Sequence, residues 1–321
     1  MNPVSIDTEL TALLQALARV GGPIQWALLA SAVFLGLVSF VPSLEKIRER
    51  TLWVVVGLLV SGEVALVWFH WRLYEITAVV SPVTGETTGH VAVSLWVESE
   101  KLFVWALILG LMALFAKRHR PELMPGVCFS LALLTIGAVL WGQPFTDPLP
   151  QFLGQYRGYL AATASGDINA AVGAYQGMEG SRAYYYNTWY MWIHPPLLFI
   201  SYGAFVMSFV ATLFMWRRRH SAYEETAYRW ARLGYLPLTF GMLLGFPWAI
   251  LAWQGDSWWW SGKVNMSIMM WLLYTAYLHG RLYLRRKGMW RWVALLAMLS
   301  FLVLVLTYLT TYIVPGAHSY A

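Results

Sequence analysis

Eight apolar runs, each long enough to cross a bilayer, dominate this sequence. A helix needs roughly 20 residues to span a hydrocarbon core about 30 Å thick. Runs of this length lie near 23–42, 51–71, 92–116, 122–141, 189–216, 233–252, 263–284 and 291–314. With 59% hydrophobic and 12% charged residues, the chain is too apolar for a soluble globular surface. The sequence therefore predicts an all-α polytopic membrane protein with about eight transmembrane helices.

The basic residues predict how these helices are oriented. Four short connections hold 3, 3, 5 and 5 of the Lys and Arg residues, 16 of the 22 in the chain: 43–50, 117–122, 217–232 and 281–291. They fall at every second connection, as the positive-inside rule requires of cytoplasmic loops. We therefore expect a protein of the inner (cytoplasmic) membrane with both termini outside. The net charge of +6 is a topology signal and predicts no nucleic-acid partner.

The remaining segments complete the predicted domain organisation. Residues 1–22 contain a leucine stripe behind acidic residues, which indicates an interfacial amphipathic helix, and we expect no cleavable secretory signal there. The connection 142–188 is too long for a simple loop, so we expect a partly helical cap that faces outward with 72–91 and 253–262. The order is then the amphipathic helix 1–22, helices one to four in 23–141, the cap 142–188, and helices five to eight in 189–321.

Cys128 is the single cysteine, and it lies within an apolar run. One cysteine excludes an intrachain disulfide, a CxxC redox pair and the CxxCH motif of covalent haem attachment. Any haem in this chain is therefore held non-covalently.

Three features lie at the predicted outer face. They are His194 at the start of the fifth helix, a tryptophan cluster in the sixth connection, and His318 after the eighth helix; the cluster comprises Trp253, Trp258, Trp259 and Trp260. Haem iron takes axial imidazoles, and its flat macrocycle needs large aromatic walls. The residues alone leave a second interpretation open, in which His194 starts a helix before two prolines and the tryptophans form an interfacial belt.

The segments around these features resemble one family residue by residue. The stretch WWWSGKVNMSIMMWLLYTAYLHGR, residues 258–281, is similar to a W-x-W-D-P-K-E loop followed by a helix ending in Y-L-H-x-R. That pattern is typical of the haem-handling WWD-loop membrane proteins of cytochrome c maturation, which include CcsA, CcmC and CcmF. The chain resembles them well over residues 190–321, and in the first half only by helix number.

The resemblance implies a site and a cofactor. It implies that His194 and His318 are the axial ligands of haem b iron, and that the tryptophan cluster is the haem-binding loop. Two departures stand in that loop, because Ser261 and Gly262 replace the family's aspartate and proline, and Val264 replaces its glutamate. Asp256 lies nearby. A chain without the loop carboxylate is expected to bind haem, but its delivery step is in question.

His279 raises the question of a second haem. The resemblance implies that it is a ligand to an intramembrane haem, whereas a histidine at a helix end is also favourable beside the helix dipole. The partner candidates on the predicted cytoplasmic side, His119 and His220, lie in basic connections. A companion membrane subunit could instead supply the partner.

Ionisable residues also interrupt the apolar runs of the first half. Glu63 belongs to the second predicted helix, and Glu98, Glu100 and Lys101 to the third. Each ionised group there costs about 2.5–3.5 kcal/mol on insertion scales, so these side chains should face the protein interior. Neutralisation by Lys101 is the simpler interpretation, and a proton or quinone path is the alternative. His70 lies on the same helical face as Glu63, at a position we interpret as interfacial.

Two functions follow from these observations. The resemblance implies a haem-binding protein of cytochrome c biogenesis, working within a haem lyase or synthase system, that presents haem to a periplasmic apocytochrome c. Arg157 or Arg182 would pair the haem propionates. The alternative is a haem b-containing electron-transfer subunit linking membrane quinol to a periplasmic c-type cytochrome.

Overall fold

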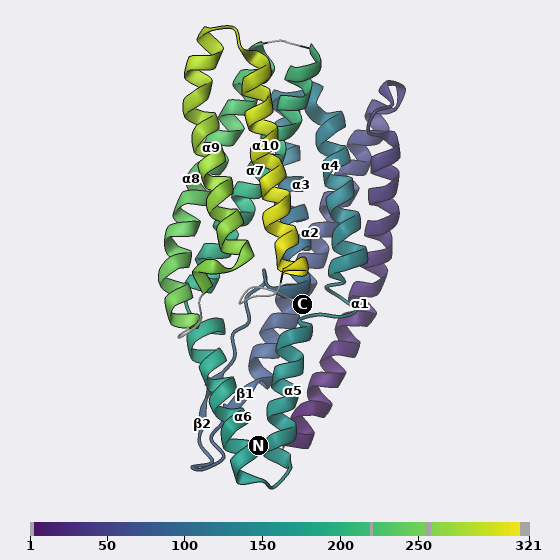
Figure 1. Cartoon of the computed structure of the whole chain (residues 1–321). Coiled ribbons are helices and arrows are strands. Elements are labelled where there is room, and N and C mark those ends of the chain that lie inside the picture. The colour runs from purple at the N-terminus through teal and green to yellow at the C-terminus, as the bar shows by residue number, and fades with distance from the viewer. Residues whose placement is uncertain (1–2, 219–220, 254–257, 315–321) are drawn as a thin grey trace. The chain divides into compact units, whose positions relative to one another are not determined.

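The computed structural model describes residues 3–218, 221–253 and 258–314 (Figure 1). Within them the fold is helical apart from one short hairpin. The α-helices are α1 (Pro3–Val38), α2 (Glu45–Ile76), α3 (Lys101–His119), α4 (Met124–Gly137), α5 (Pro150–Ala164), α6 (Ile168–Gly180), α7 (Tyr190–Arg218), α8 (Ser221–Ala252), α9 (Gly262–Arg286) and α10 (Trp290–Ile313). The strands are β1 (Ala78–Val80) and β2 (Thr87–His90). Short 3-10 or π turns are η1 (Pro42–Leu44), η2 (Glu98–Glu100), η3 (Pro121–Leu123), η4 (Ala138–Gly142), η5 (Ser181–Tyr186) and η6 (Trp258–Trp260).

The chain forms two compact units. Unit 1 comprises Met1–Leu111 and Leu131–Trp192, and unit 2 comprises Met112–Ser130 and Ile193–Ala321. Helices α3, α4 and α7 each contribute residues to both units.

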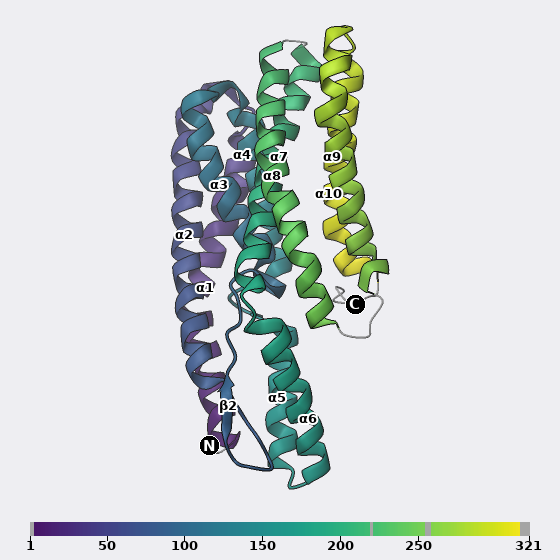
Figure 2. The same ribbon diagram turned by 90° about the vertical axis from the view of Figure 1, so that its left-hand side faces the viewer.

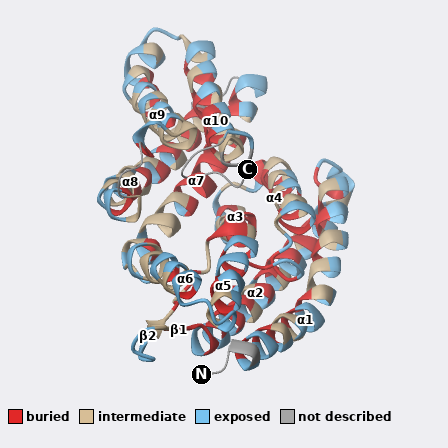
Figure 3. Cartoon of the chain, turned by 60° about the horizontal axis from the view of Figure 1, so that its bottom comes forward, coloured by how far each residue is buried: buried red, intermediate tan, exposed pale blue. Residues whose placement is uncertain are grey.

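Seven helical segments of the described residues are long and apolar enough to cross a membrane. They are Ser5–Val38, Pro42–Ile76, Glu98–His119, Pro121–Gly142, Tyr190–Arg218, Ala222–Ala252 and Trp290–Thr310. Each matches one predicted helix, so the all-α polytopic class is confirmed. The remaining predicted helix, the seventh, is α9, which has 25 residues; its polar residues, including Lys263 and Arg281, lower its hydropathy. Of the seven segments, α7 has the largest buried share, whereas α1 and α8 have the smallest (Figure 3).

The first helix differs from expectation in one respect. α1 continues through Pro23 without a break, so no change of secondary structure separates an interfacial helix 1–22 from a membrane span. Its leucine stripe packs inside the protein, because Leu10 and Leu17 are fully buried, and α1 packs against α2 and α5. The location of the first turns relative to a bilayer stays a prediction, as does the outward orientation of both termini.

The predicted third helix begins too early. Residues 91–97 are not helical, and Glu98 has a positive φ of 46°. The backbone of this stretch is satisfied by other elements: the side chain of Asn187 donates to the carbonyl of His90 at 2.8 Å and accepts from the N–H of Ala92 at 2.9 Å. Trp96 donates its indole N–H to the carbonyl of Met191, which Pro195 leaves without its helical donor. Glu98 and Glu100 therefore lie in η2, before α3, and Lys101 is the first residue of α3.

The segment 142–188 is partly helical, as predicted from its length. Helices α5 and α6 form a hairpin, and β1 and β2 lie beside it (Figures 1 and 2). Tyr159 ties the strands to α5, because its hydroxyl accepts from the N–H of Val80 at 2.8 Å and donates to the carbonyl of Val80 at 2.9 Å. From here on, the name cap covers α5, α6, β1 and β2, so it adds the two strands to helices of the predicted cap 142–188. Its outward orientation stays a prediction.

Aromatic stacking holds the helices of unit 2 together. Phe205 of α7 stacks on Tyr274 of α9 at 3.6 Å, and Phe209 of α7 stacks on Phe301 of α10 at 4.1 Å, both between ring centroids. Helices α9 and α10 pack along each other (Figure 2). α7 therefore forms the centre of unit 2, which places His194 on its best-packed helix.

Candidate functional site

His194 lies in the first turns of α7, with its ring against α8. Its Nδ1 donates to the carbonyl of Gly241 at 2.6 Å, because a carbonyl oxygen only accepts. A Cβ on Gly245 would lie 2.7 Å from Cε1 of His194, so only glycine there admits the ring in this position. The hydrogen bond fixes the tautomer with the proton on Nδ1, and the lone pair is then on Nε2. Histidines that bind metals are usually oriented in this way.

Tryptophans extend from His194 toward the end of α8. Trp248 lies 5.9 Å from the imidazole, tilted by 32°, and Trp253 packs edge-on against Trp248 at 4.8 Å. Trp258 is buried and contacts Phe246, whereas Trp259 and Trp260 are 51% and 75% exposed. The predicted cluster thus divides into the buried Trp258 and half-buried Trp253 on one side and the exposed Trp259 and Trp260 on the other.

The end of α10 lies beside the start of α9. A Cβ on Gly262 would lie 3.2 Å from Cγ1 of Val314, which places the last described residue next to the loop that carries η6. Lys263, half-buried in the first turn of α9, interacts electrostatically with His194. His318 and Asp256 lie outside the described residues. Ser261, which replaces the family's aspartate, caps α9 by accepting from the N–H of Val264 at 3.4 Å.

His279 is on the exposed side of α9. Its Nδ1 donates to the carbonyl of Thr275, one turn earlier, at 2.9 Å. The hydroxyl of Thr275 is in turn 2.7 Å from that of Tyr235 on α8. His119 instead bonds the carbonyl of Phe115 and stacks on its ring, and His220 lies outside the described residues. Among the residues described, no group of three or more His, Cys, Asp or Glu side chains could hold a metal ion.

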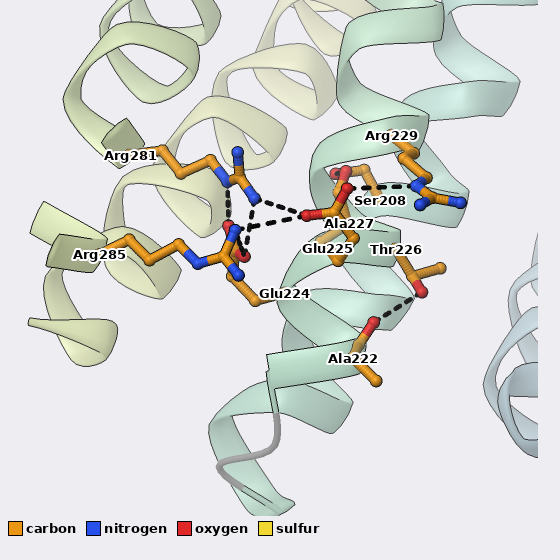
Figure 4. Close-up of polar contacts among 9 residues, drawn as sticks. All are labelled: Ser208, Ala222, Glu224, Glu225, Thr226, Ala227, Arg229, Arg281 and Arg285. Atoms are coloured by element: carbon orange, nitrogen blue, oxygen red, sulfur yellow. Dashed lines mark hydrogen bonds and ion pairs between the residues drawn. The ribbon is translucent and has the colours of Figure 1, made fainter. Parts of the chain in front are cut away.

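A buried ion-pair network joins α8 and α9 (Figure 4). Arg281 donates through Nε and Nη2 to both oxygens of Glu224, the second at 2.9 Å, and also reaches Glu225 at 2.8 Å. Its guanidinium covers the ring of Tyr228 at 3.8 Å. Sequence analysis did not identify this network, because Glu224 and Arg281 are 57 residues apart and lie in segments interpreted as charged loops.

The ionisable residues of the first half form two separate groups in unit 1. Glu98 accepts from the backbone N–H groups of Gln151 and Phe152 at 2.8 and 3.1 Å, and Lys101 interacts electrostatically with it. Glu100 contacts His70 instead, at 2.7 Å. Lys101 thus contributes to the neutralisation of Glu98, and His70, interpreted as interfacial, is 8% exposed.

Both arginines considered for haem propionates are engaged within unit 1. Arg182 forms two hydrogen bonds to the carboxylate of Glu179, at 2.8 and 2.6 Å. Arg157 lies 3.3 Å from Asp7. A propionate would have to replace one of these partners, so pairing with haem stays a prediction.

Three residues of the site were missed from the sequence. Trp248 belongs to an apolar run and carries no signal that separates it from other helix residues. Gly241 and Gly245 are spaced four apart, a pattern that predicts close helix approach, and this spacing is the signal that could have found them.

Comparison with known proteins identifies the family. The family model described as cytochrome C assembly protein matches residues 95–318. The probable cytochrome c-type biogenesis protein NrfE of Escherichia coli is 30% identical over 64% of this chain and 35% of its own length. The cytochrome c-type biogenesis protein CcmF of Haemophilus influenzae is 28% identical over 75% of this chain and 34% of its own. The chain thus spans about a third of the length of these relatives.

A solved structure has the same fold. The cytochrome c haem lyase CcmF superimposes with a TM-score of 0.55 and 20% identity, over 92% of this chain and 47% of that one. The family model covers the α7 histidine, the tryptophan loop and α9, where the resemblance was strongest, and also α3 to α6, where it rested on helix number alone. The chain therefore belongs to the cytochrome c assembly protein family.

Proposed function

We propose that the chain binds haem b on the periplasmic side of the inner membrane and presents it to an apocytochrome c during maturation. His194 is one axial ligand, and Trp248, Trp253 and Trp258 form the adjoining wall. The observation that carries the proposal is the 2.6 Å hydrogen bond from His194 Nδ1 to Gly241, which directs Nε2 toward an iron. When bound, haem supplies the vinyl groups to which cytochrome thiols attach.

His318 is proposed as the second axial ligand. Three residues separate it from Val314, so the Cα atoms of Val314 and His318 are at most about 14 Å apart along an extended chain. Val314 lies against Gly262, which closely follows η6. The segment that carries His318 therefore begins beside the tryptophan loop. This short tether supports a site that His194 and His318 share.

His279 is proposed as the ligand of a second haem. Nδ1 is engaged with Thr275, so Nε2 of this exposed ring is available on the surface of α9. We propose that a companion membrane subunit supplies the opposite ligand. The relatives named above are biogenesis proteins, so an electron-transfer role is not proposed.

Difference spectra with haem quantitation on purified protein test the assignment. We expect His194→Ala and His318→Ala each to abolish a bis-histidine spectrum at the outer site. His279→Ala should leave that spectrum and remove at most a second haem. His119→Ala is the control, because its ring is stacked on Phe115. Full haem content with unchanged spectra in the His194 variant would refute the site.

A further inference from the structure

A histidine and two glutamates of unit 1 belong to candidate membrane-spanning segments and interact with one another. His70 of α2 is 8% exposed, and Glu100 of η2 is fully buried. Nδ1 of His70 lies 2.8 Å from the carbonyl of Val93, and Nε2 lies 2.7 Å from Oε1 of Glu100. Both ring nitrogens of His70 are therefore engaged in a site that bulk water does not reach.

The partners of His70 fix how its protons are arranged. A carbonyl can only accept, so Nδ1 carries a hydrogen and donates to Val93. A single proton then lies between Nε2 and the carboxyl of Glu100. The pair is either imidazolium with carboxylate or imidazole with carboxylic acid, and it is electrically neutral in both forms.

Glu63 adds one further carboxyl to this pair. It precedes His70 by two turns of α2 and interacts electrostatically with both His70 and Glu100. One oxygen of Glu63 and one of Glu100 are buried without a hydrogen-bond partner among the described residues. A buried carboxylate oxygen in that state has lost its water and gained no donor, whereas a protonated carboxyl removes the charge.

The other charges nearby are balanced elsewhere. The two oxygens of Glu98 accept hydrogen bonds from two backbone N–H groups of α5. Lys101 interacts electrostatically with Glu98, as do Tyr185 and Tyr186 of η5. α1 has no charged residue from Val20 to Val38, and α4 has none. His70 interacts electrostatically with both Glu63 and Glu100, and two carboxylates with one imidazolium would leave a net negative charge.

We propose that Glu63, His70 and Glu100 form an intramembrane proton-binding site. At rest the cluster holds one proton between His70 and Glu100 and a second on Glu63, which makes it neutral. Glu63 is half-buried whereas the other two are buried, so it is the member that exchanges its proton with the outside. Loss of that proton leaves a charge spread over the three groups, and its return restores neutrality.

Infrared spectroscopy of the full chain in lipid nanodiscs tests this site without haem. Above pH 6, surface Asp and Glu side chains are ionised, so a protonated carboxyl C=O band there reports buried acids. We expect a band that shifts in D2O and loses intensity as the pH is raised. Glu63→Gln should remove it, and Glu100→Gln, whose amide keeps a bond to His70, should retain it but change the pH at which it disappears.

Glu98→Gln is the matched control, since Glu98 is also a buried carboxyl of unit 1 but uses both oxygens as acceptors. It should leave the band unchanged. Absence of the band in the wild-type protein at every pH above 6 would overturn the proposal, as would a band that D2O and pH do not affect, or one lost in Glu98→Gln and kept in Glu63→Gln. The wild-type measurement decides the question even if a variant fails to fold.

Discussion

The imidazole of His194 rests directly on the backbone of α8, and two glycines make this approach feasible. Gly241 supplies the carbonyl that accepts from Nδ1, and Gly245 leaves the space that the ring fills. A residue with no side chain thus positions the residue that would hold iron.

Gly245→Ala tests this positioning. The added Cβ would lie 2.7 Å from Cε1 and 3.0 Å from Nδ1 of His194, and overpacking of this kind costs about 1–3 kcal/mol. We expect haem affinity to fall about tenfold, the equivalent of about 1.4 kcal/mol, measured by haem titration of the apoprotein. Gly57→Ala is the control, because nothing lies within 4 Å of its Cβ; equal affinity in the two variants would refute the positioning role.

Glu98 has an equally specific structural role. Its carboxylate caps the N-terminus of α5, although Glu98 and Gln151 are 53 residues apart in sequence. Glu98→Ala removes the acceptor of two helix-terminal N–H groups, and we expect a local destabilisation of about 1–2 kcal/mol. Amide hydrogen exchange at Gln151 and Phe152 measures it directly. Glu86→Ala, at an exposed position of the hairpin turn, should leave those amides unchanged; unchanged exchange in Glu98→Ala would contradict the cap.

At the scale of elements, sequence periodicity predicted most helices but not how they begin. Apolar length identified the spans, since a bilayer demands it. It failed at 91–97, where apolar residues adopt an extended path because Asn187, His70 and Thr77 satisfy the backbone. It also missed Trp248 and the Arg281 network, because contacts between segments distant in sequence leave no local pattern.

The Arg281 network predicts how firmly α8 and α9 are joined. Breaking a buried pair by removing one partner costs about 3–5 kcal/mol, since the other charge stays buried. We expect Arg281→Ala to lower the free energy of unfolding by that amount in detergent. Arg229→Ala is the control, because Arg229 bonds Glu225 with 69% of its side chain exposed, and it should cost less than about 1 kcal/mol. Similar losses in both variants would argue against a buried pair.

The cap should loosen in acid. Hydrogen bonds from Arg182 hold the pKa of Glu179 below its ordinary value, and Thr88 of β2 donates to the same carboxylate at 2.9 Å. A lowered acid pKa contributes stability that is present above the ordinary pKa of about 4.3 and is lost as the pH falls through the folded-state value. Hydrogen exchange in β2 should therefore accelerate below about pH 4 relative to Glu179→Gln, which should lack this dependence.

At the scale of the whole molecule, fold class and family were accessible from sequence, and the site only in part. His194 and the tryptophan loop were predicted as site residues because the resemblance is local and gap-free there. The partners of His194, which are Gly241 and Gly245, were not predicted. The space beside a glycine is defined only when the helices have packed together. The chain also matches only part of its relatives, so its cellular role needs a test of its own.

Deletion of the gene provides that test. If the chain serves cytochrome c maturation, we expect cells without it to lose covalent c-type haem, measured by haem staining of denatured membrane proteins. Complementation with wild type should restore staining, and His194→Ala should not. Loss of a single respiratory activity while all c-type cytochromes remain mature would instead indicate an electron-transfer subunit.

The interleaving of the two units has a consequence for biosynthesis. Residues 112–130 belong to unit 2, where Gly126 packs against Val210 and Phe214, yet 131–192 return to unit 1. At about 5–20 residues per second, the ribosome needs roughly 3–12 s to make that intervening stretch. During this interval the tip of the α3–α4 hairpin has no α7 to receive it. It can be shielded only by lipid, by the insertion machinery or by a chaperone until α7 is made.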